Sequence, residues 1–306
     1  MLVTNKEIMS AAAARGYGVG AFNINNLETV LAIAEATVEE KSPVIVAVTP
    51  SAIKYGGLEY LASIVKAAAR TVPQPMSLHL DHGKDVEIVA KCIDVGFTSV
   101  MIDASHLSFE ENVAMTKTVV GLAHPEGVAV EAELGRLAGV EESTVEEKDA
   151  VLTDPDAAKD FVERTGVDAL AVAIGTSHGA YKFKGKPELD FERLKAIQER
   201  VDVLLVLHGA SSVPSWIIEK ATKYGAELAG AKGIPEEHIK KAVSLGVSKI
   251  NIDTDLRLAF TGAVREVLVT SPKQYDPRKI LGPAKEAMKT VVKGKMQLFG
   301  SSGKAQ

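Results

Sequence analysis

The sequence contains a single cysteine, Cys92, among 306 residues. One thiol cannot form an internal disulfide, and it excludes the thiolate clusters of zinc fingers and iron–sulfur centres. No apolar run approaches the roughly 20 residues that a membrane-spanning helix requires. The first residues also lack the charged and apolar segments of a signal peptide. We therefore expect a soluble, cytoplasmic protein.

The chain also lacks an excess of positive charge. It has 35 Lys and Arg against 40 Asp and Glu, for a formal net charge of −5. Both signs are interspersed along the chain. Nucleic acids and anionic membranes bind surfaces that are dense in Lys and Arg, so we expect neither as a partner. The 46% hydrophobic and 25% charged residues are typical of a globular enzyme.

Short apolar runs recur along the whole chain, each bounded by Gly, Pro or polar residues. Segments with apolar residues at helical spacing separate these runs. Asp154 ahead of Pro155, and Asp190, are expected to begin two of the helices. Runs that are apolar throughout are typical of parallel strands that are covered on both faces. Eight such strands are expected, at 18–23, 43–49, 76–82, 99–105, 128–135, 169–176, 203–209 and 247–253.

This alternation predicts an α/β protein, a (β/α)8 TIM barrel that forms one domain over residues 1–306. Residues 270–306 are expected to add a C-terminal helical extension. A doubly wound open sheet is the alternative, but the glycine-rich fingerprint after the first strand is absent. Residues 136–153 are expected to form an active-site loop or a solvated surface excursion. Residues 224–237 are expected to be an insertion between the last two strands.

Three of the seven histidines follow three different strands at equivalent positions, His82, His178 and His208. In barrels of this kind the active site lies at the carboxyl ends of the strands. Three imidazoles leave a tetrahedral Zn²⁺ one open position for substrate or water. The pattern therefore favours Zn²⁺ or a similar divalent ion over three separate structural histidines. The remaining four are expected to be structural, and they are His79, His106, His124 and His238.

Carboxylates also stand at the strand ends. Asp81 directly precedes His82 and is expected to be a general acid–base, or a group that only orients a ligand. Asp103 and Glu133 are expected to orient ligands or to offer a second metal position. Neighbouring residues of a regular strand point to opposite faces. For Asp81 and His82 to share one site, the chain must therefore leave strand geometry near Asp81, and Gly83 is well placed to allow this.

Small residues follow the sixth and seventh strands. Gly179 and the run Gly209–Ser212 are expected to let backbone N–H groups approach an anion closely. Phosphate sites near the last two strands recur in barrels, and Lys182 and Thr254 are candidate additional donors. Glycines serve ordinary turns as well. Beside a three-histidine site, however, we interpret them as part of a phosphate site.

Several stretches together resemble the class II, metal-dependent fructose-1,6-bisphosphate aldolases and the related tagatose-bisphosphate aldolases. The resemblance covers essentially the whole chain. It implies reversible, zinc-dependent cleavage of fructose 1,6-bisphosphate to dihydroxyacetone phosphate and glyceraldehyde 3-phosphate, in glycolysis and gluconeogenesis. The matching stretches are 80–83, 131–136, 175–179, 207–211, 251–254 and 275–278.

The resemblance also implies roles for individual residues. Asp81 would exchange the proton of the C4 hydroxyl. Glu141, on the loop 136–153, would exchange the proton at the dihydroxyacetone-phosphate carbon. Zn²⁺, or Co²⁺ or another divalent ion in its place, would be held by the three strand-end histidines. Asp103 and Glu133 would bind a displaced or second metal ion. A monovalent cation (Na⁺, K⁺ or NH₄⁺) would accompany the substrate.

A larger set is expected to bind the sugar bisphosphate. The resemblance implies a homo-oligomer, a dimer or tetramer, in which Arg278 reaches the far phosphate in a neighbouring subunit's site. The expected substrate-binding residues are Asn23, Thr49, Gly179, Lys182, Gly209, Ala210, Ser211, Asn251, Ile252, Asp253, Thr254 and Arg278.

Other functions remain as alternatives. A Schiff-base aldolase needs an activated lysine inside the barrel, for which Lys249 and Lys182 are the candidates. A metal-dependent hydrolase of the same fold would place a His-x-His pair on the first strand, which 18–23 lacks. A binding or scaffold barrel would need neither acid–base groups nor metal ligands. Fructose and tagatose bisphosphates differ at one stereocentre. Asp253 and the insertion 224–237 favour the fructose substrate.

Overall fold

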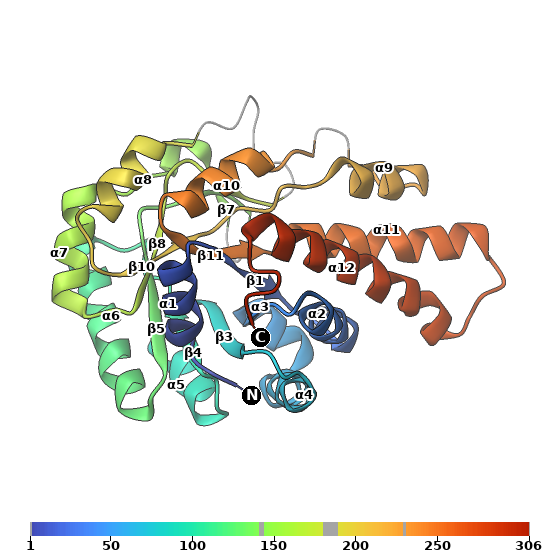
Figure 1. The fold of residues 1–306 in the computed structure, drawn as a ribbon, viewed down its shortest axis with the longest axis horizontal. Helices are drawn as coiled ribbons and strands as arrows, with labels where there is room; N and C mark the ends of the chain where they lie inside the picture. Colours follow the sequence, from blue (N-terminus) through green and yellow to red (C-terminus); the bar gives the residue numbers. More distant parts are fainter. Residues whose placement is uncertain (1, 141–143, 180–188, 229–230, 306) are drawn as a thin grey trace.

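The computed structural model describes residues 2–140, 144–179, 189–228 and 231–305, with the backbone alone of Val140, Thr144, Glu147 and His178. Eight parallel strands close into a barrel in the order β1-β11-β10-β8-β5-β4-β3-β2 (Figure 1). The predicted (β/α)8 barrel is therefore confirmed. The strands are β1 (Val19–Asn23), β2 (Val44–Val48), β3 (Met76–Gly83), β4 (Ser99–Ile102), β5 (Ala129–Leu134), β8 (Ala169–Val172), β10 (Leu204–Leu207) and β11 (Val247–Ile252).

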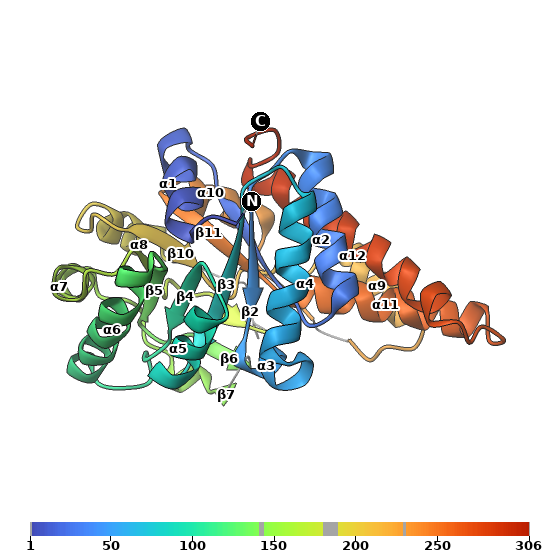
Figure 2. The same ribbon diagram turned by 90° about the horizontal axis from the view of Figure 1, so that it is seen from below.

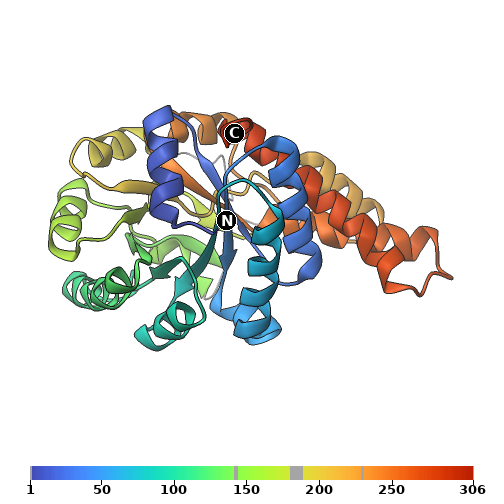
Figure 3. The same cartoon turned by 60° about the horizontal axis from the view of Figure 1, so that its bottom comes forward.

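Helices form a ring around these strands (Figure 3). The two helix starts expected from the sequence are confirmed, since Asp154 accepts from the backbone N–H groups of α7 and Asp190 from that of Arg193 in α8. The helices are α1 (Asn5–Arg15), α2 (Leu27–Glu40), α3 (Pro50–Gly56), α4 (Leu58–Thr71), α5 (Val86–Asp94), α6 (Phe109–Ala123), η1 (His124–Glu126), α7 (Pro155–Thr165), α8 (Phe191–Gln198), α9 (Ser215–Lys223), α10 (Glu236–Ser244), α11 (Thr254–Thr270) and α12 (Pro277–Phe299).

The strands separate two hydrophobic cores because their side chains alternate between the two faces. The outer core lies between strands and helices and includes Leu78 and Leu80 of β3. The inner core fills the barrel with small and branched residues such as Ala21 and Val206, and it continues into Met9 of α1. α1 therefore closes the amino end of the barrel, which leaves the carboxyl end for the site.

The described residues of the connection 136–153 include three short elements of secondary structure. They are β6 (Ala138–Val140), β7 (Thr144–Val145) and the short helix η2 (Glu147–Asp149). β6 pairs with β7 and also with β9 (Ser177–His178), which gives a small three-stranded sheet. In Figure 2 this sheet lies at the end of the barrel opposite α1 and both chain termini. The connection thus lies on the same end as the strand termini, beside the segment that carries His178.

The two other irregular regions lie near the C-terminus. Of the expected insertion 224–237, residues 236–237 begin α10, and residues 224–228 and 231–235 lie between α9 and α10. After the last strand, α11 and α12 form a long antiparallel pair that projects from the barrel (Figure 1). α12 returns along α2 and α11. Within the described ranges, none of the helices combines the length and apolar character that crossing a membrane requires.

Asp168, just before β8, ties α1 and η1 to the amino end of the barrel. Its carboxylate accepts from Lys6 Nζ, from His124 Nε2 and from the backbone N of Val130, each at 2.8 Å. Burial alone would raise the pKa of this carboxyl, but Lys6, the Val130 N–H and His124 outweigh it and hold the pKa below its ordinary value. His124 is therefore structural, as expected.

We expect Asp168→Asn to lower the free energy of unfolding by about 1–3 kcal/mol at neutral pH, because the amide keeps an acceptor but loses the charge. The pKa is lower in the folded state. The contribution is therefore complete above the ordinary aspartate pKa and is lost as the pH falls through the folded value. Urea unfolding at neutral and increasingly acid pH measures this, with the exposed Asp202→Asn as control. A difference that does not shrink in acid would contradict the assignment.

Candidate active site

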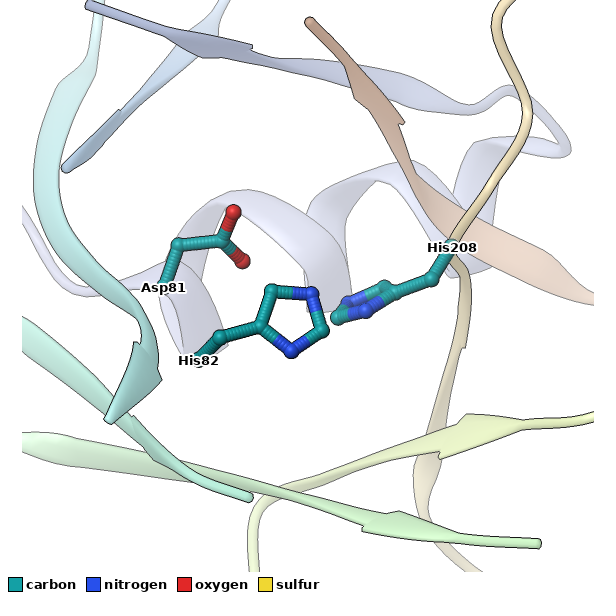
Figure 4. Close-up of side chains that lie close together, drawn as sticks. All are labelled: Asp81, His82 and His208. Atoms are coloured by element: carbon teal, nitrogen blue, oxygen red, sulfur yellow. The ribbon is translucent and has the colours of Figure 1, made fainter. Parts of the chain in front are cut away.

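Polar side chains from several strands converge at the carboxyl end of the barrel. Figure 4 shows Asp81 and His82, both from β3, with the ring of His208 close to that of His82. His208 directly follows β10. The other members of this group are Asn23 of β1, Asp103 after β4, Glu131 and Glu133 of β5, and Asn251 of β11.

A local break in β3 lets two successive residues face the same site. His82 has φ +50°, in the left-handed region that non-glycine residues seldom adopt. The pairing of β3 with β4 shifts register between Leu80 and Gly83. The expected departure from strand geometry is therefore confirmed, and it falls at His82 itself. A Cβ on Gly83 would lie 2.5 Å from the carbonyl oxygen of Met101, so the glycine permits a close approach of β4.

Asp81 is fully buried, and both of its carboxylate oxygens accept from amides. Asn23 Nδ2 donates to Oδ2 at 2.8 Å, and Asn251 Nδ2 donates to Oδ1 at 2.9 Å. The two amides come from β1 and β11, which are neighbours in the barrel. A carboxylate held in this way has a fixed orientation, which is what proton transfer to a positioned substrate requires.

The two imidazoles meet edge to face, with ring centroids 4.6 Å apart at 69°. His82 Nδ1 lies 2.8 Å from Asp103 Oδ2, and His208 Nδ1 lies 3.3 Å from Glu133 Oε2. The potential ligand atoms of Asp81, His82 and His208 lie within 4.8 Å of one another, as do those of His82, Asp103 and Glu133. Imidazole nitrogens and carboxylate oxygens at this separation fit a divalent metal ion.

Charge in this cluster favours a cation. Burial alone would raise the pKa of Asp103, but hydrogen bonds from His82 and Ser105 hold it far below its ordinary value. Burial also disfavours a charged His208, yet its hydrogen bonds to Glu131 and Glu133 outweigh this and raise its pKa to about 9. Carboxylates that stabilise positive charge at His208 equally stabilise a metal ion beside it, and a proton and a metal then compete for the ring.

A buried ion pair lies directly behind His208. Lys249 Nζ is 2.8 Å from Glu131 Oε1, and their side chains are 0% and 2% exposed. The same oxygen of Glu131 is 3.0 Å from His208 Nε2. Burial would raise the pKa of Glu131, but Lys249 and His208 hold it far below its ordinary value. Glu131 therefore fixes His208 Nε2 as a donor and leaves Nδ1 turned toward Glu133.

Sequence reasoning missed this layer. The signal that could have revealed it is that Glu131 and Lys249 are charged residues inside predicted strands, before their carboxyl ends. His79 also borders the layer, with Nε2 3.6 Å from Glu131 Oε2. Burial and then Lys249 lower the pKa of His79 to about 4. A Schiff-base lysine must reach the substrate as a free amine, whereas Lys249 is fully buried and engaged by a carboxylate.

A cavity of about 480 Å³ opens beside this cluster. Asn23 and Asp253 of the expected substrate-binding set line it, together with Ser51, Tyr55 and Arg257, which sequence reasoning missed. Arg257 Nη2 lies 2.7 Å from Asp253 Oδ2. Thr49, also in the expected set, caps α3: its hydroxyl accepts from the Ala52 N–H and lies 2.9 Å from Ser51 Oγ.

The other predicted substrate-binding residues differ in whether their side chain or their backbone could contact a substrate. Gly179 and Gly209 have φ +87° and +60°, as expected of turns that expose backbone groups. Ile252 points into the outer core, so only its backbone can reach a ligand. The side chain of Arg278 is 91% exposed and pairs with Asp276 of the same helix start, and Arg278 does not line the cavity. Glu141, Lys182 and the side chain of His178 lie outside the described residues.

A (β/α)8 barrel with imidazoles and carboxylates this close at its strand ends has the architecture of a metal-dependent barrel enzyme. Residues 3–227 and 228–304 match the family described as fructose-bisphosphate aldolase class-II. The chain is 59% identical to a fructose-bisphosphate aldolase of Thermus caldophilus over 100% of both chains. It is 50% identical to that of Helicobacter pylori, over 99% of this chain and 100% of the relative.

A solved structure agrees with these relatives. The crystal structure of the YdjI aldolase from Escherichia coli K12 superposes with a TM-score of 0.82, at 35% identity over 100% of both chains. The chain therefore belongs to the class II fructose-bisphosphate aldolase family. This family is one of metal-dependent lyases that act on sugar phosphates, which agrees with the donor set described above.

We expect Glu131→Gln to weaken divalent-metal affinity by about 10- to 100-fold, because the carboxylate that fixes the His208 ring is lost while the shape is kept. Competition with a chromophoric chelator measures this affinity directly. Glu126→Gln, at an exposed glutamate of η1, is the matched control. Equal affinities of Glu131→Gln and wild type would show that Glu131 does not orient a metal ligand.

Proposed function

We propose that this chain is a class II fructose-bisphosphate aldolase that reversibly cleaves fructose 1,6-bisphosphate to dihydroxyacetone phosphate and glyceraldehyde 3-phosphate. The relatives named for this activity support the proposal over the full length of the chain. The observation that carries it is the placement of Asp81. Its carboxylate is held by two amides, and its ligand atom lies within 4.8 Å of those of His82 and His208. A fixed proton acceptor thus adjoins a metal-type cluster.

For the metal we propose Zn²⁺, with Co²⁺ or another divalent ion able to take its place. His82 and His208 would hold it, with His178 as the third ligand that the family resemblance implies. Asp103 and Glu133 would bind the ion in a second position, which the grouping of their oxygens with His82 supports. When bound, such an ion polarises the ketone oxygen and stabilises the negative charge that develops as the C3–C4 bond breaks.

The chain's own groups handle the protons. In cleavage Asp81 accepts the proton of the C4 hydroxyl, and in condensation it returns that proton to the aldehyde oxygen. Asn23 and Asn251 hold its two oxygens, so the carboxylate need not reorganise during transfer. We assign proton exchange at the dihydroxyacetone-phosphate carbon to Glu141 from the family resemblance.

The phosphates would anchor the substrate at its two ends. Gly179, Gly209–Ser211 and Asn251–Thr254 would bind the dihydroxyacetone-phosphate half, with Lys182 as a further donor and a monovalent cation (Na⁺, K⁺ or NH₄⁺) nearby. Arg278 would bind the far phosphate in a neighbouring subunit of a dimer or tetramer. Its 91% exposure at the start of the projecting helix α12 supports this assignment. A cytoplasmic location, as expected from the sequence, is part of the same proposal.

Chelation and reductive trapping test the reaction class. We expect EDTA to abolish aldol cleavage, Zn²⁺ to restore it, and borohydride with substrate to leave activity intact, because no lysine forms an imine. Borohydride inactivation would indicate a Schiff-base enzyme. On the two ketose bisphosphates, kcat/KM should favour fructose over tagatose 1,6-bisphosphate. A ratio that favours tagatose would make this the tagatose-directed alternative, and metal-dependent hydrolysis without aldol cleavage would make it a hydrolase.

Replacing the proposed proton acceptor tests the mechanism. Asp81→Ala should lower kcat by about 10²- to 10⁴-fold, because general acid–base catalysis is lost. Metal content should remain close to wild type, since the histidines are unchanged. The exposed Asp202, before β10 at the amino end of the barrel, supplies the control Asp202→Ala. If Asp81→Ala turns over within a few-fold of wild type with its metal bound, the acid–base role is wrong.

A further inference from the structure

The loop after β10 contains a backbone conformation that the local sequence does not favour. Val213 has φ +47°, in the left-handed region, although its β-branched side chain makes this conformation a rare outlier. Such residues persist only where the surroundings determine the backbone, and they cluster at functional sites. The same loop carries His208 and Gly209. The contacts that keep Val213 in this conformation therefore also affect the backbone of the site.

A buried ion pair holds this part of the loop. Asp255, the second residue of α11, accepts from the Val213 N at 2.9 Å and from the Ser212 N at 3.3 Å. Lys295 Nζ of α12 lies 2.7 Å from Asp255 Oδ2 and also donates to the hydroxyl of Ser212. The side chains of Lys295 and Asp255 are 4% and 0% exposed. Neither residue was expected from the sequence to contribute to the site.

The loop is enclosed on its other sides as well. A Cβ on Gly209 would lie 2.7 Å from the carbonyl oxygen of Ser177, and one on Gly233 would lie 2.3 Å from the carbonyl carbon of Ser212. Ile234 N donates to Ser211 O at 3.1 Å. The backbone of 209–213 is therefore packed against β9, the segment before α10, α11 and α12.

Two successive backbone amides of this loop, those of Ala210 and Ser211, are buried and have no acceptor in the described part of the chain. The two residues are 0% and 3% exposed. Buried backbone N–H groups nearly always have partners. Consecutive N–H groups of this kind form a concave site for an anion. With Ser212 and Val213 bound to Asp255, the preceding amides remain for a ligand.

We propose that the Asp255–Lys295 ion pair is a positioning device that fixes loop 209–213, so that the Ala210 and Ser211 amides bind a phosphate group of the substrate. The inference rests on the proposed function, since it takes the anion to be a sugar phosphate. Lys295 touches no substrate itself. It balances the charge of Asp255, which would otherwise be a buried carboxylate without a cation. The C-terminal half of α12, which packs against the barrel while the beginning of the helix projects from it (Figure 1), thereby becomes part of phosphate recognition.

The test uses Lys295→Met, which breaks the pair, and Lys295→Arg, which keeps the charge. Lys295 is among the residues that line a cavity of about 530 Å³. The control is Lys293→Met, on the same helix, whose lysine pairs with Glu39 of α2 on the surface. Because Lys295→Met leaves a buried charge and can fail to fold, the double variant Asp255→Asn with Lys295→Met provides a neutral pair.

We expect KM for fructose 1,6-bisphosphate to rise about tenfold or more in Lys295→Met and in the double variant, because a hydrogen bond to a charged group is weakened. In these two variants kcat and zinc content should stay within a few-fold of wild type. Lys295→Arg should recover most of the affinity for fructose 1,6-bisphosphate. Lys293→Met should have the same KM as wild type. Loss of kcat together with zinc would instead mean that the pair positions His208, and the proposal would be wrong.

Calorimetric titration with inorganic phosphate separates this inference from the proposed function. Wild type should bind phosphate, and Lys295→Met should bind it about tenfold more weakly or worse. This result is expected even if the wild type fails to cleave fructose 1,6-bisphosphate, an outcome that would overturn the function alone. The positioning role would be wrong if the two variants that remove the pair bind phosphate as tightly as wild type. It would also be wrong if wild type does not bind phosphate.

Discussion

The site depends on one break in regular strand geometry. Along an unbroken β3, Asp81 and His82 would point to opposite faces, and one of them would enter the outer core. The left-handed backbone at His82 and the register shift before Gly83 turn both side chains into the barrel. A proton acceptor and a potential metal ligand thereby come from adjacent residues. The backbone conformation, more than side-chain rotation, therefore sets the distance between the Asp81 carboxylate and the His82 ring.

Buried charges in this barrel are arranged in shared pairs. Glu131 serves both Lys249 and His208, and Asp255 serves both Lys295 and the loop after β10. Each charge is expensive to bury and is offset only by a partner held at short range. Such pairs are weak evidence for stability. Both pairs lie behind groups that are proposed to bind metal or phosphate. This placement fits a role in orienting those groups, at some cost in stability.

Much of the fold and part of the site could be predicted because the relevant signals are local. Apolar runs define the strands. A polar residue at the end of such a run is expected at the carboxyl end of the barrel, as Asp103 and His208 are. The pairs could not be predicted, because their members are far apart in the chain. Glu131 and Lys249 are separated by 118 residues, and Lys295 of the second pair is 83 residues from Ser212 of the loop that it contacts. Only the closed barrel and the return of α12 bring them together.

The two halves of the site differ in how their backbones are held in place. Asn23, Glu131 and Asn251, which hold Asp81 and His208, lie on regularly paired strands whose hydrogen-bonded ladders fix the backbone. The phosphate-type loop 209–213 has no such ladder and includes a strained residue, so a free loop would relax to other conformations. It needs support from outside the barrel, and Asp255 and Lys295 supply this from two helices. Side chains of two helices that contact the loop, and not the substrate, are thus required by the proposed phosphate site.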